Sequence, residues 1–206
     1  MAVVGVVPAA GRGSRFAASE PGAPLKLLTL IDGEAMVRRA VASLLEGGAD
    51  RCVVVASAGN EAVVRSVLNG LPVAVVVNPD PERGMFSSIQ CGVATLGAED
   101  RCVLLPGDMP YVRPETVATV LSAAIRSGLT AAASHDGRRG HPLVFSTTLR
   151  DRILQARADS ILSEERSRDE CLSVEVPDPG VHRDVDRPGD IAIVVDGRSK
   201  TDRPRE

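Results

Sequence analysis

Short apolar runs rich in valine alternate along the chain with segments whose apolar residues recur at helical spacing. The apolar runs cover residues 3–7, 51–56, 73–78, 102–105 and 130–134. Helical spacing between them predicts helices over residues 36–45, 60–69, 85–96 and 114–125. Because continuous valine-rich strands are typical of sheets covered on both faces, the pattern predicts an α/β, Rossmann-like fold: a mostly parallel sheet with helices on both faces.

The pattern becomes looser after residue 140. Residues 142–146 and 172–176 favour strands, and the charged segment 147–168 favours helix. The last residues, 198–206, are polar, which predicts a disordered tail. No linker-like stretch divides the rest, so we expect a single domain over residues 1–197.

Composition narrows the range of partners. Lysine and arginine total 24 against 27 acidic residues, and aromatic residues make up 2% of the chain with no tryptophan. Nucleic acid is therefore not an expected partner, because it would require a positive surface or several exposed rings. The four cysteines form no CxxC pair, and no apolar run approaches the ~20 residues of a membrane span. We expect a protein of the reducing cytoplasm with no membrane partner.

The loop after the first predicted strand consists of small and cationic residues. It contains Ala9, Ala10, Gly11, Arg12, Gly13, Ser14 and Arg15. Small residues let backbone N–H groups approach a phosphate, and the arginines add charge-assisted hydrogen bonds. A flexible glycine-rich turn is the alternative interpretation. Two known phosphate motifs do not fit, because Phe16 stands where a dinucleotide fingerprint needs its third glycine and the pattern GxxxxGK(S/T) is absent.

Three charged positions are candidates for phosphate and metal chemistry. Lys26 is the only lysine among the first 199 residues of a chain that otherwise uses arginine. This suggests that a compact ammonium is needed there to follow a phosphoryl group; an ordinary surface lysine is the alternative. Asp108 follows the run 102–105 at the carboxyl edge of the predicted sheet, where it could hold Mg²⁺ or sit in an ordinary turn. Asp184 and Asp186 alternate along a short predicted strand, so only one of them can face a cleft.

Several polar residues allow two interpretations each. Ser87 and Ser88 begin a predicted helix, where they could cap it or help to bind an anion at its N-terminus. Asn78 precedes a proline and could form a turn or hydrogen-bond a base edge. His141 lies in a dense polar loop over residues 138–142, which is a candidate binding segment or a solvated hairpin turn.

Taken in order, these motifs resemble the nucleotidyltransferases that activate small phosphorylated metabolites. The resemblance covers nearly the whole chain and is closest to the molybdenum cofactor cytidylyltransferases, which are related to the molybdopterin guanylyltransferases. It rests on Ala9-Ala10-Gly11-x-Gly13-x-Arg15-Phe16, Lys26-Leu27-Leu28, Asn78, Gly84-Met85-x-Ser87-Ser88-Ile89, Pro106-Gly107-Asp108-Met109-Pro110, Arg139-Gly140-His141-Pro142 and Asp184-Val185-Asp186-Arg187-Pro188-x-Asp190. Two positions depart from it: Pro8 is more like the cytidylyltransferase of isoprenoid synthesis, and Arg187 replaces the usual threonine.

The resemblance implies a fold of the nucleotide-diphospho-sugar transferase type and a Mg²⁺-dependent transfer of CMP from CTP to a phosphorylated acceptor, with release of pyrophosphate. The implied acceptor is molybdenum cofactor, and a molybdoenzyme is an implied partner. The implied catalytic residues are Lys26, Arg15 and Asp108, and the implied metal ligands are Asp108 and Asp186. The nucleotide would contact Ala9, Ala10, Gly11, Arg12, Gly13, Ser14, Arg15, Lys26, Asn78, Ser87 and Ser88, and the acceptor would contact Arg139, Gly140 and His141.

Other functions stay open beside this one. Guanylyl-transferring relatives usually have a second glycine where this chain has Ala10, so the extra methyl group favours CTP over GTP, and another phosphorylated metabolite could be the acceptor. A non-catalytic nucleotide-binding chaperone for a molybdoenzyme would fit a chain that had lost its metal ligands, but both carboxylates are present. A nicotinamide oxidoreductase is disfavoured by the failed dinucleotide fingerprint.

Overall fold

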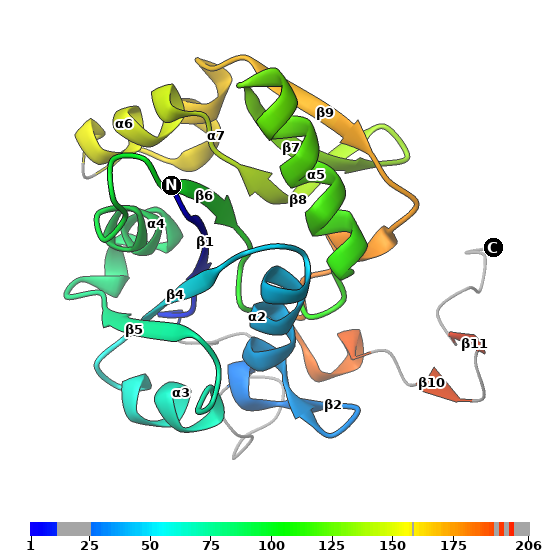
Figure 1. Ribbon diagram of the computed structural model, residues 1–206. Coiled ribbons are helices and arrows are strands. Elements are labelled where there is room, and N and C mark those ends of the chain that lie inside the picture. The colour runs from blue at the N-terminus through cyan, green and yellow to red at the C-terminus, as the bar shows by residue number, and fades with distance from the viewer. Residues whose placement is uncertain (12–25, 158, 192–193, 196–197, 200–206) are drawn as a thin grey trace.

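A seven-stranded sheet forms the centre of the computed structural model and carries helices on both faces (Figure 1). From one edge to the other the strands are β5 (Val73–Val77), β4 (Arg51–Ala56), β1 (Val3–Pro8), β6 (Arg101–Leu104), β8 (Arg138–Val144), β7 (Thr130–His135) and β9 (Cys171–Glu175). Among the described strands of this sheet, only β8 runs antiparallel to its neighbours. The predicted α/β fold with a mostly parallel sheet is confirmed.

The structure describes residues 1–11, 26–157, 159–191, 194–195 and 198–199. One face of the sheet carries α2 (Met36–Glu46), α3 (Glu61–Val67) and α5 (Pro114–Ser127), and the other carries α4 (Met85–Val93) and α6 (Thr147–Gln155), with α7 (Leu162–Ser167) packed on α6. Short 3₁₀ helices are η1 (Lys26–Leu28), η2 (Pro81–Arg83), η3 (Pro179–His182) and η4 (Pro188–Asp190). Two small hairpins pair β2 (Leu30–Ile31) with β3 (Glu34–Ala35) and β10 (Val194–Val195) with β11 (Arg198–Ser199).

The two faces of the sheet divide the core between them. Val7, Val54 and Val103 point to the face under α2 and α5, whereas Val6 and Leu104 point to the face under α4 and α6, and all five are fully buried. Successive residues of a strand point to opposite faces, so strands buried on both sides must be apolar at every position. This is why valine runs without alternation mark the central strands. No helix in the described part of the chain has the length and apolar character needed to cross a membrane.

The structure departs from the sequence-based expectations in the second half of the chain. The helix expected over 147–168 is two helices, α6 and α7, separated by an extended Ala156. The strand expected over 142–146 is β8, which begins at Arg138, so Arg139, Gly140 and His141 lie in a strand and not in a loop. Asp136 and Gly137, at φ values of 51° and 71°, form the turn between β7 and β8.

The end of the chain also differs from expectation. Arg198 and Ser199 were expected to begin a disordered tail, but they form β11 and pair with β10. Residues 200–206, the remainder of that expected tail, lie outside the described residues.

A buried carboxylate joins η3 to the start of α5. Asp178 is 2% exposed and accepts hydrogen bonds from the backbone N–H of Gly180 (2.9 Å), the backbone N–H of Arg113 (3.0 Å) and the hydroxyl of Thr116 (2.7 Å). It therefore fixes the position of the short helix that precedes the segment carrying Asp186.

Asp178→Ala should lower the free energy of unfolding by about 2–4 kcal/mol, because it leaves buried donors without an acceptor. Denaturant unfolding followed by circular dichroism measures the loss. Asp151→Ala is the control, since Asp151 is exposed and forms a surface ion pair with Arg150, and it should cost less than about 0.5 kcal/mol. An Asp178→Ala variant as stable as this control would contradict the anchoring role.

Candidate active site

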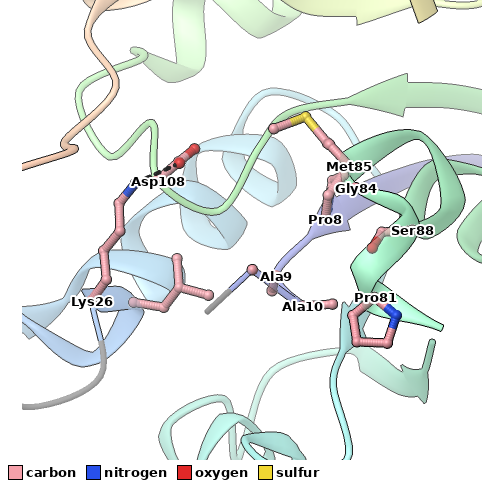
Figure 2. A pocket seen from close by; sticks show the side chains of 11 residues that line it. Pro8, Ala9, Ala10, Lys26, Pro81, Gly84, Met85, Ser88 and Asp108 are labelled. Carbon is pink, nitrogen blue, oxygen red and sulfur yellow. Dashed lines mark hydrogen bonds and ion pairs between the residues drawn. The ribbon is translucent and has the colours of Figure 1, made fainter. Parts of the chain in front are cut away.

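A cleft of about 460 Å³ opens at the edge of the sheet where the parallel strands end. In open α/β sheets this edge is where ligands bind. Five segments line the cleft: the end of β1 with the loop after it, η1, η2, the start of α4 with the glycine before it, and the loop after β6. Its lining residues are Pro8, Ala9, Ala10, Gly11, Lys26, Leu27, Pro81, Gly84, Met85, Ser88 and Asp108 (Figure 2).

The start of the expected phosphate loop is held against the sheet. The backbone N–H of Ala9 donates to the carbonyl of Val55 (2.8 Å), and the side-chain amide of Asn60 donates to the carbonyl of Ala9 (2.8 Å). Ala9 and Ala10 are buried, and none of the described residues comes within 4 Å of the position that a Cβ on Gly11 would take. The rest of this loop, Arg12, Gly13, Ser14 and Arg15, lies outside the described residues. Asn60 was not found from the sequence, because an asparagine before a helix usually signals a cap.

The Lys26 ammonium lies between two carboxylates on the wall of the cleft. Nζ is 2.9 Å from Oδ2 of Asp108 and 2.7 Å from Oδ1 of Asp186. The Lys26 side chain is 10% exposed, against 21% for Asp108 and 33% for Asp186. Burial by itself would lower the pKa of Lys26, but the hydrogen bonds to Asp186 and Asp108 and their charges outweigh it and raise that pKa above its usual value. Figure 2 shows the Lys26 side chain pointing toward Asp108.

Backbone contacts hold both carboxylates in place independently of Lys26. The N–H of Val185 donates to the carbonyl of Asp108 (2.9 Å), which fastens the two segments together. Asp190 accepts from the N–H groups of Asp186 (3.0 Å) and Arg187 (2.7 Å). Two carboxylate oxygens that converge on one cation make a donor set that a hard divalent cation also fits. From the sequence, Asp190 had no role of its own beyond its place as the last residue of the motif over 184–190.

Asp184 and Asp186 lie in different surroundings. Residues 184–186 form no strand: Val185 is buried, Asp186 contacts Lys26, and Asp184 is exposed and lines a different pocket. The alternation expected from the sequence is therefore present, without the expected strand.

Asn78 does not face the cleft. Its side chain is 2% exposed, and its amide group donates to the hydroxyls of Ser87 (2.8 Å) and Ser88 (3.0 Å) while its oxygen accepts from the N–H of Asp80 (2.9 Å). The amide thus fixes the connection between β5 and α4. Of these three expected nucleotide contacts, Ser88 alone is among the described residues that line the cleft.

A second pocket of about 300 Å³ adjoins the first. Its lining residues are Met85, Pro106, Asp108, Met109, Arg139, Gly140, His141, Arg166, Val181, His182 and Asp184. The structure therefore brings the three expected acceptor residues to a pocket that borders the first at Asp108 and Met85. Arg166 and His182 join them from α7 and η3, and neither was identified from the sequence.

The structure limits what two of the expected acceptor residues, Gly140 and His141, can offer a ligand. A Cβ on Gly140 would lie 2.1 Å from the carbonyl oxygen of Val181, so the missing side chain makes room for η3 and not for a ligand. Burial lowers the pKa of His141 to about 4, although a hydrogen bond to the Leu104 carbonyl and the charge of Asp108 oppose this. His141 is therefore neutral near pH 7 and offers no positive charge to an anion. Its Nδ1 is buried, with no hydrogen-bond partner in the described part of the chain.

The His141 ring should make folding stability depend on pH. Its folded pKa of about 4 lies below the ordinary value of 6.5, so the unfolded chain takes up the proton first and stability falls as pH drops from about 6.5 to about 4. His141→Gln lacks this proton uptake. Denaturant unfolding over that pH range should show wild type losing on the order of 1 kcal/mol or more relative to the variant. Parallel pH profiles would rule out a depressed pKa.

Comparison with known proteins shows which family the chain is similar to. Residues 5–170 match the model of the MobA-like NTP transferase domain. The "Nicotine blue oxidoreductase" of Paenarthrobacter nicotinovorans is 32% identical over 158 residues, covering 73% of this chain and 74% of that protein. The chain also matches proteins named "Bifunctional protein GlmU", but it spans only 25% and 37% of the length of two of them.

Solved structures with the same fold agree with this family. A nucleotidyl transferase from Methanothermobacter thermautotroptrophicus is 25% identical, with a TM-score of 0.74 over 92% of this chain and 94% of that one. Rv0371c from Mycobacterium tuberculosis, in a structure described as a complex with manganese, is 22% identical, with a TM-score of 0.72 over 92% of this chain and 96% of that one. The resemblance drawn from the ordered motifs is confirmed: the chain belongs to the MobA-like NTP transferase family of nucleotide-transferring enzymes.

Proposed function

We propose that the protein transfers CMP from CTP to the phosphate of a small acceptor and releases pyrophosphate. The observation that carries the proposal is the Lys26 ammonium held between Asp108 and Asp186 where two pockets meet. A phosphate oxygen of the acceptor attacks the α-phosphorus of the triphosphate, and the bond from that phosphorus to the bridging oxygen of pyrophosphate breaks. The reaction needs alignment and charge stabilisation and no covalent enzyme intermediate.

The first cleft suits the triphosphate. The Ala9 N–H is already bonded to Val55, but the backbone N–H groups that follow it can approach phosphate oxygens closely, because Ala10 and Gly11 are small. Lys26 supplies a positive charge for the α-phosphate, and Arg12 and Arg15 remain the proposed partners of the β- and γ-phosphates. A divalent metal, for which we propose Mg²⁺, would offset phosphate charge when held by Asp108 and Asp186. The manganese complex of a structural neighbour supports a divalent ion in this fold.

The second pocket suits the acceptor. Arg139 and Arg166 bring positive charge to it, which favours an anionic and hence phosphorylated ligand. Its shared boundary at Asp108 would bring the acceptor phosphate next to the α-phosphate. We propose molybdenum cofactor as this acceptor and a molybdoenzyme as a partner, on the resemblance of the ordered motifs. The four cysteines are free thiols, which favours a reducing cytoplasm as the compartment.

A redox activity is the second candidate, because a 32% identical relative is named an oxidoreductase. The two functions differ in what they consume. Nucleotidyl transfer consumes a nucleoside triphosphate and needs the charged Lys26 cluster. A nicotinamide-dependent reaction would instead consume the reduced cofactor, which changes its absorbance. The charged cluster favours transfer.

Pyrophosphate release with each of the four triphosphates and a panel of phosphorylated acceptors tests the proposed function. We expect CTP to be used in preference to GTP, because the methyl group of Ala10, which lines the cleft, should crowd a purine. The same mixtures with reduced nicotinamide cofactors give the redox comparison. Oxidation of the cofactor without pyrophosphate release would overturn the assignment in favour of the redox activity.

Asp108→Asn keeps the side-chain size but removes the charge that faces Lys26 and the proposed metal. Turnover should fall by a factor on the order of 10² or more with the fold unchanged, as judged by circular dichroism. Asp151→Asn is the matched comparison, because Asp151 is exposed and lies outside both pockets, and its turnover should stay within roughly threefold of wild type. Equal losses in the two variants would count against Asp108 as a catalytic residue.

A further inference from the structure

Lys26 occupies the position that a metal ion held by Asp108 and Asp186 would need. Its ammonium is 2.9 Å from one carboxylate and 2.7 Å from the other, and the side chain is 10% exposed. Asp108, which lines the cleft, and Asp186 beside it thus already have a cation of the protein's own between them.

We propose that Lys26 is the resident cation of the Asp108–Asp186 pair and that a divalent metal binds there only when a triphosphate draws the ammonium away. The inference rests on the proposed function, since it assumes a triphosphate in the first cleft. Lys26 and the metal then compete for one site in the free protein and act side by side in the loaded one. Metal and nucleotide would therefore bind as a unit.

The Lys26 ammonium and a divalent metal ion compete for the carboxylate pair because both are positively charged and would occupy the same space. Each carboxylate directs an oxygen at Nζ, and a divalent ion shared by the same pair would contact the ammonium. Like charges at contact in a partly buried site repel strongly, because water screens them poorly. The metal can enter only if the ammonium leaves or if a further negative group joins the site. A triphosphate supplies that negative charge and also offers the ammonium new oxygen partners.

The chain around Lys26 permits this exchange without rebuilding the site. The Asp108 carbonyl bonds to Val185, and Asp190 holds the backbone of Asp186, so both carboxylates keep their places when the ammonium leaves. The Lys26 carbonyl accepts from the N–H of Thr29 (3.1 Å), which anchors the backbone of η1 while the four-carbon stem stays free to rotate. The cleft beside the stem offers about 460 Å³ into which the ammonium can turn.

The proposal predicts that a mutation of Lys26 strengthens metal binding, whereas most mutations at a binding site weaken it. Lys26→Met keeps a side chain of similar length and removes the charge, so the nucleotide-free variant should bind Mn²⁺ at least about tenfold more tightly than wild type. The readouts are the electron paramagnetic resonance signal of free Mn²⁺ and isothermal titration calorimetry. Arg39→Met is the matched control, because Arg39 also pairs with an aspartate, Asp32, but both residues lie outside the two pockets. The Mn²⁺ affinity of this variant should equal that of wild type.

Two further variants keep the test decisive. Lys26→Gln serves if the apolar replacement does not fold, and adding Asp186→Asn to either variant should remove the gain in affinity. Manganese should also raise the Tm of the Lys26 variant more than that of wild type, since a ligand stabilises the state it binds.

Unchanged or weaker Mn²⁺ binding by both Lys26 variants would overturn the inference. If wild type still releases pyrophosphate in a metal-dependent reaction, the proposed function survives that result. If wild type neither binds Mn²⁺ with CTP present nor releases pyrophosphate, the proposed function fails together with the inference.

Discussion

The ion-pair cluster around Lys26 is the contact on which the site depends. It joins Lys26 to residues 82 and 160 positions further along the chain, and so brings the loop after β6 and the segment after η3 to the start of η1. A buried ammonium is costly without partners, and a pair of carboxylates is costly without a cation, so each half of the cluster requires the other. The cluster thereby holds the cleft in shape while it keeps the charges that phosphate chemistry needs.

The sheet explains why these distant residues meet. Parallel strands β1 and β6 end at the same edge, so the loops that follow them carry Ala9 and Asp108 to adjacent positions. The N–H of Gly107 donates to the carbonyl of Pro8 (3.1 Å), and a Cβ on Gly107 would lie 3.3 Å from that oxygen. A glycine before Asp108 thus lets the two loops touch, and the cleft forms directly beside that contact.

The sequence predicted the parts of this structure that depend on apolar pattern or on charged residues at strand ends. Valine runs marked the central strands, and Lys26, Asp108 and Asp186, which the ordered motifs suggested, lie together in one cluster. Asn60 and Asp178 were missed because each hydrogen-bonds to a backbone group far along the chain, 51 and 65 positions away, and no spacing rule reveals such partners. The start of β8 was missed because its first residues are polar and half exposed, unlike the buried strands beside it.

The direction of β8 decides where the second pocket lies. Leu143 of β8 pairs with Leu104 of β6 in antiparallel register, so the residues that precede Leu143 extend beyond the edge at which β6 ends. Arg139 and His141 therefore reach the same edge as Asp108. A strand parallel to β6 at this position would bring its last residues to that edge and carry its first residues to the opposite one. One reversed strand in an otherwise parallel sheet is thus what sets a second pocket beside the first, with Asp108 common to both.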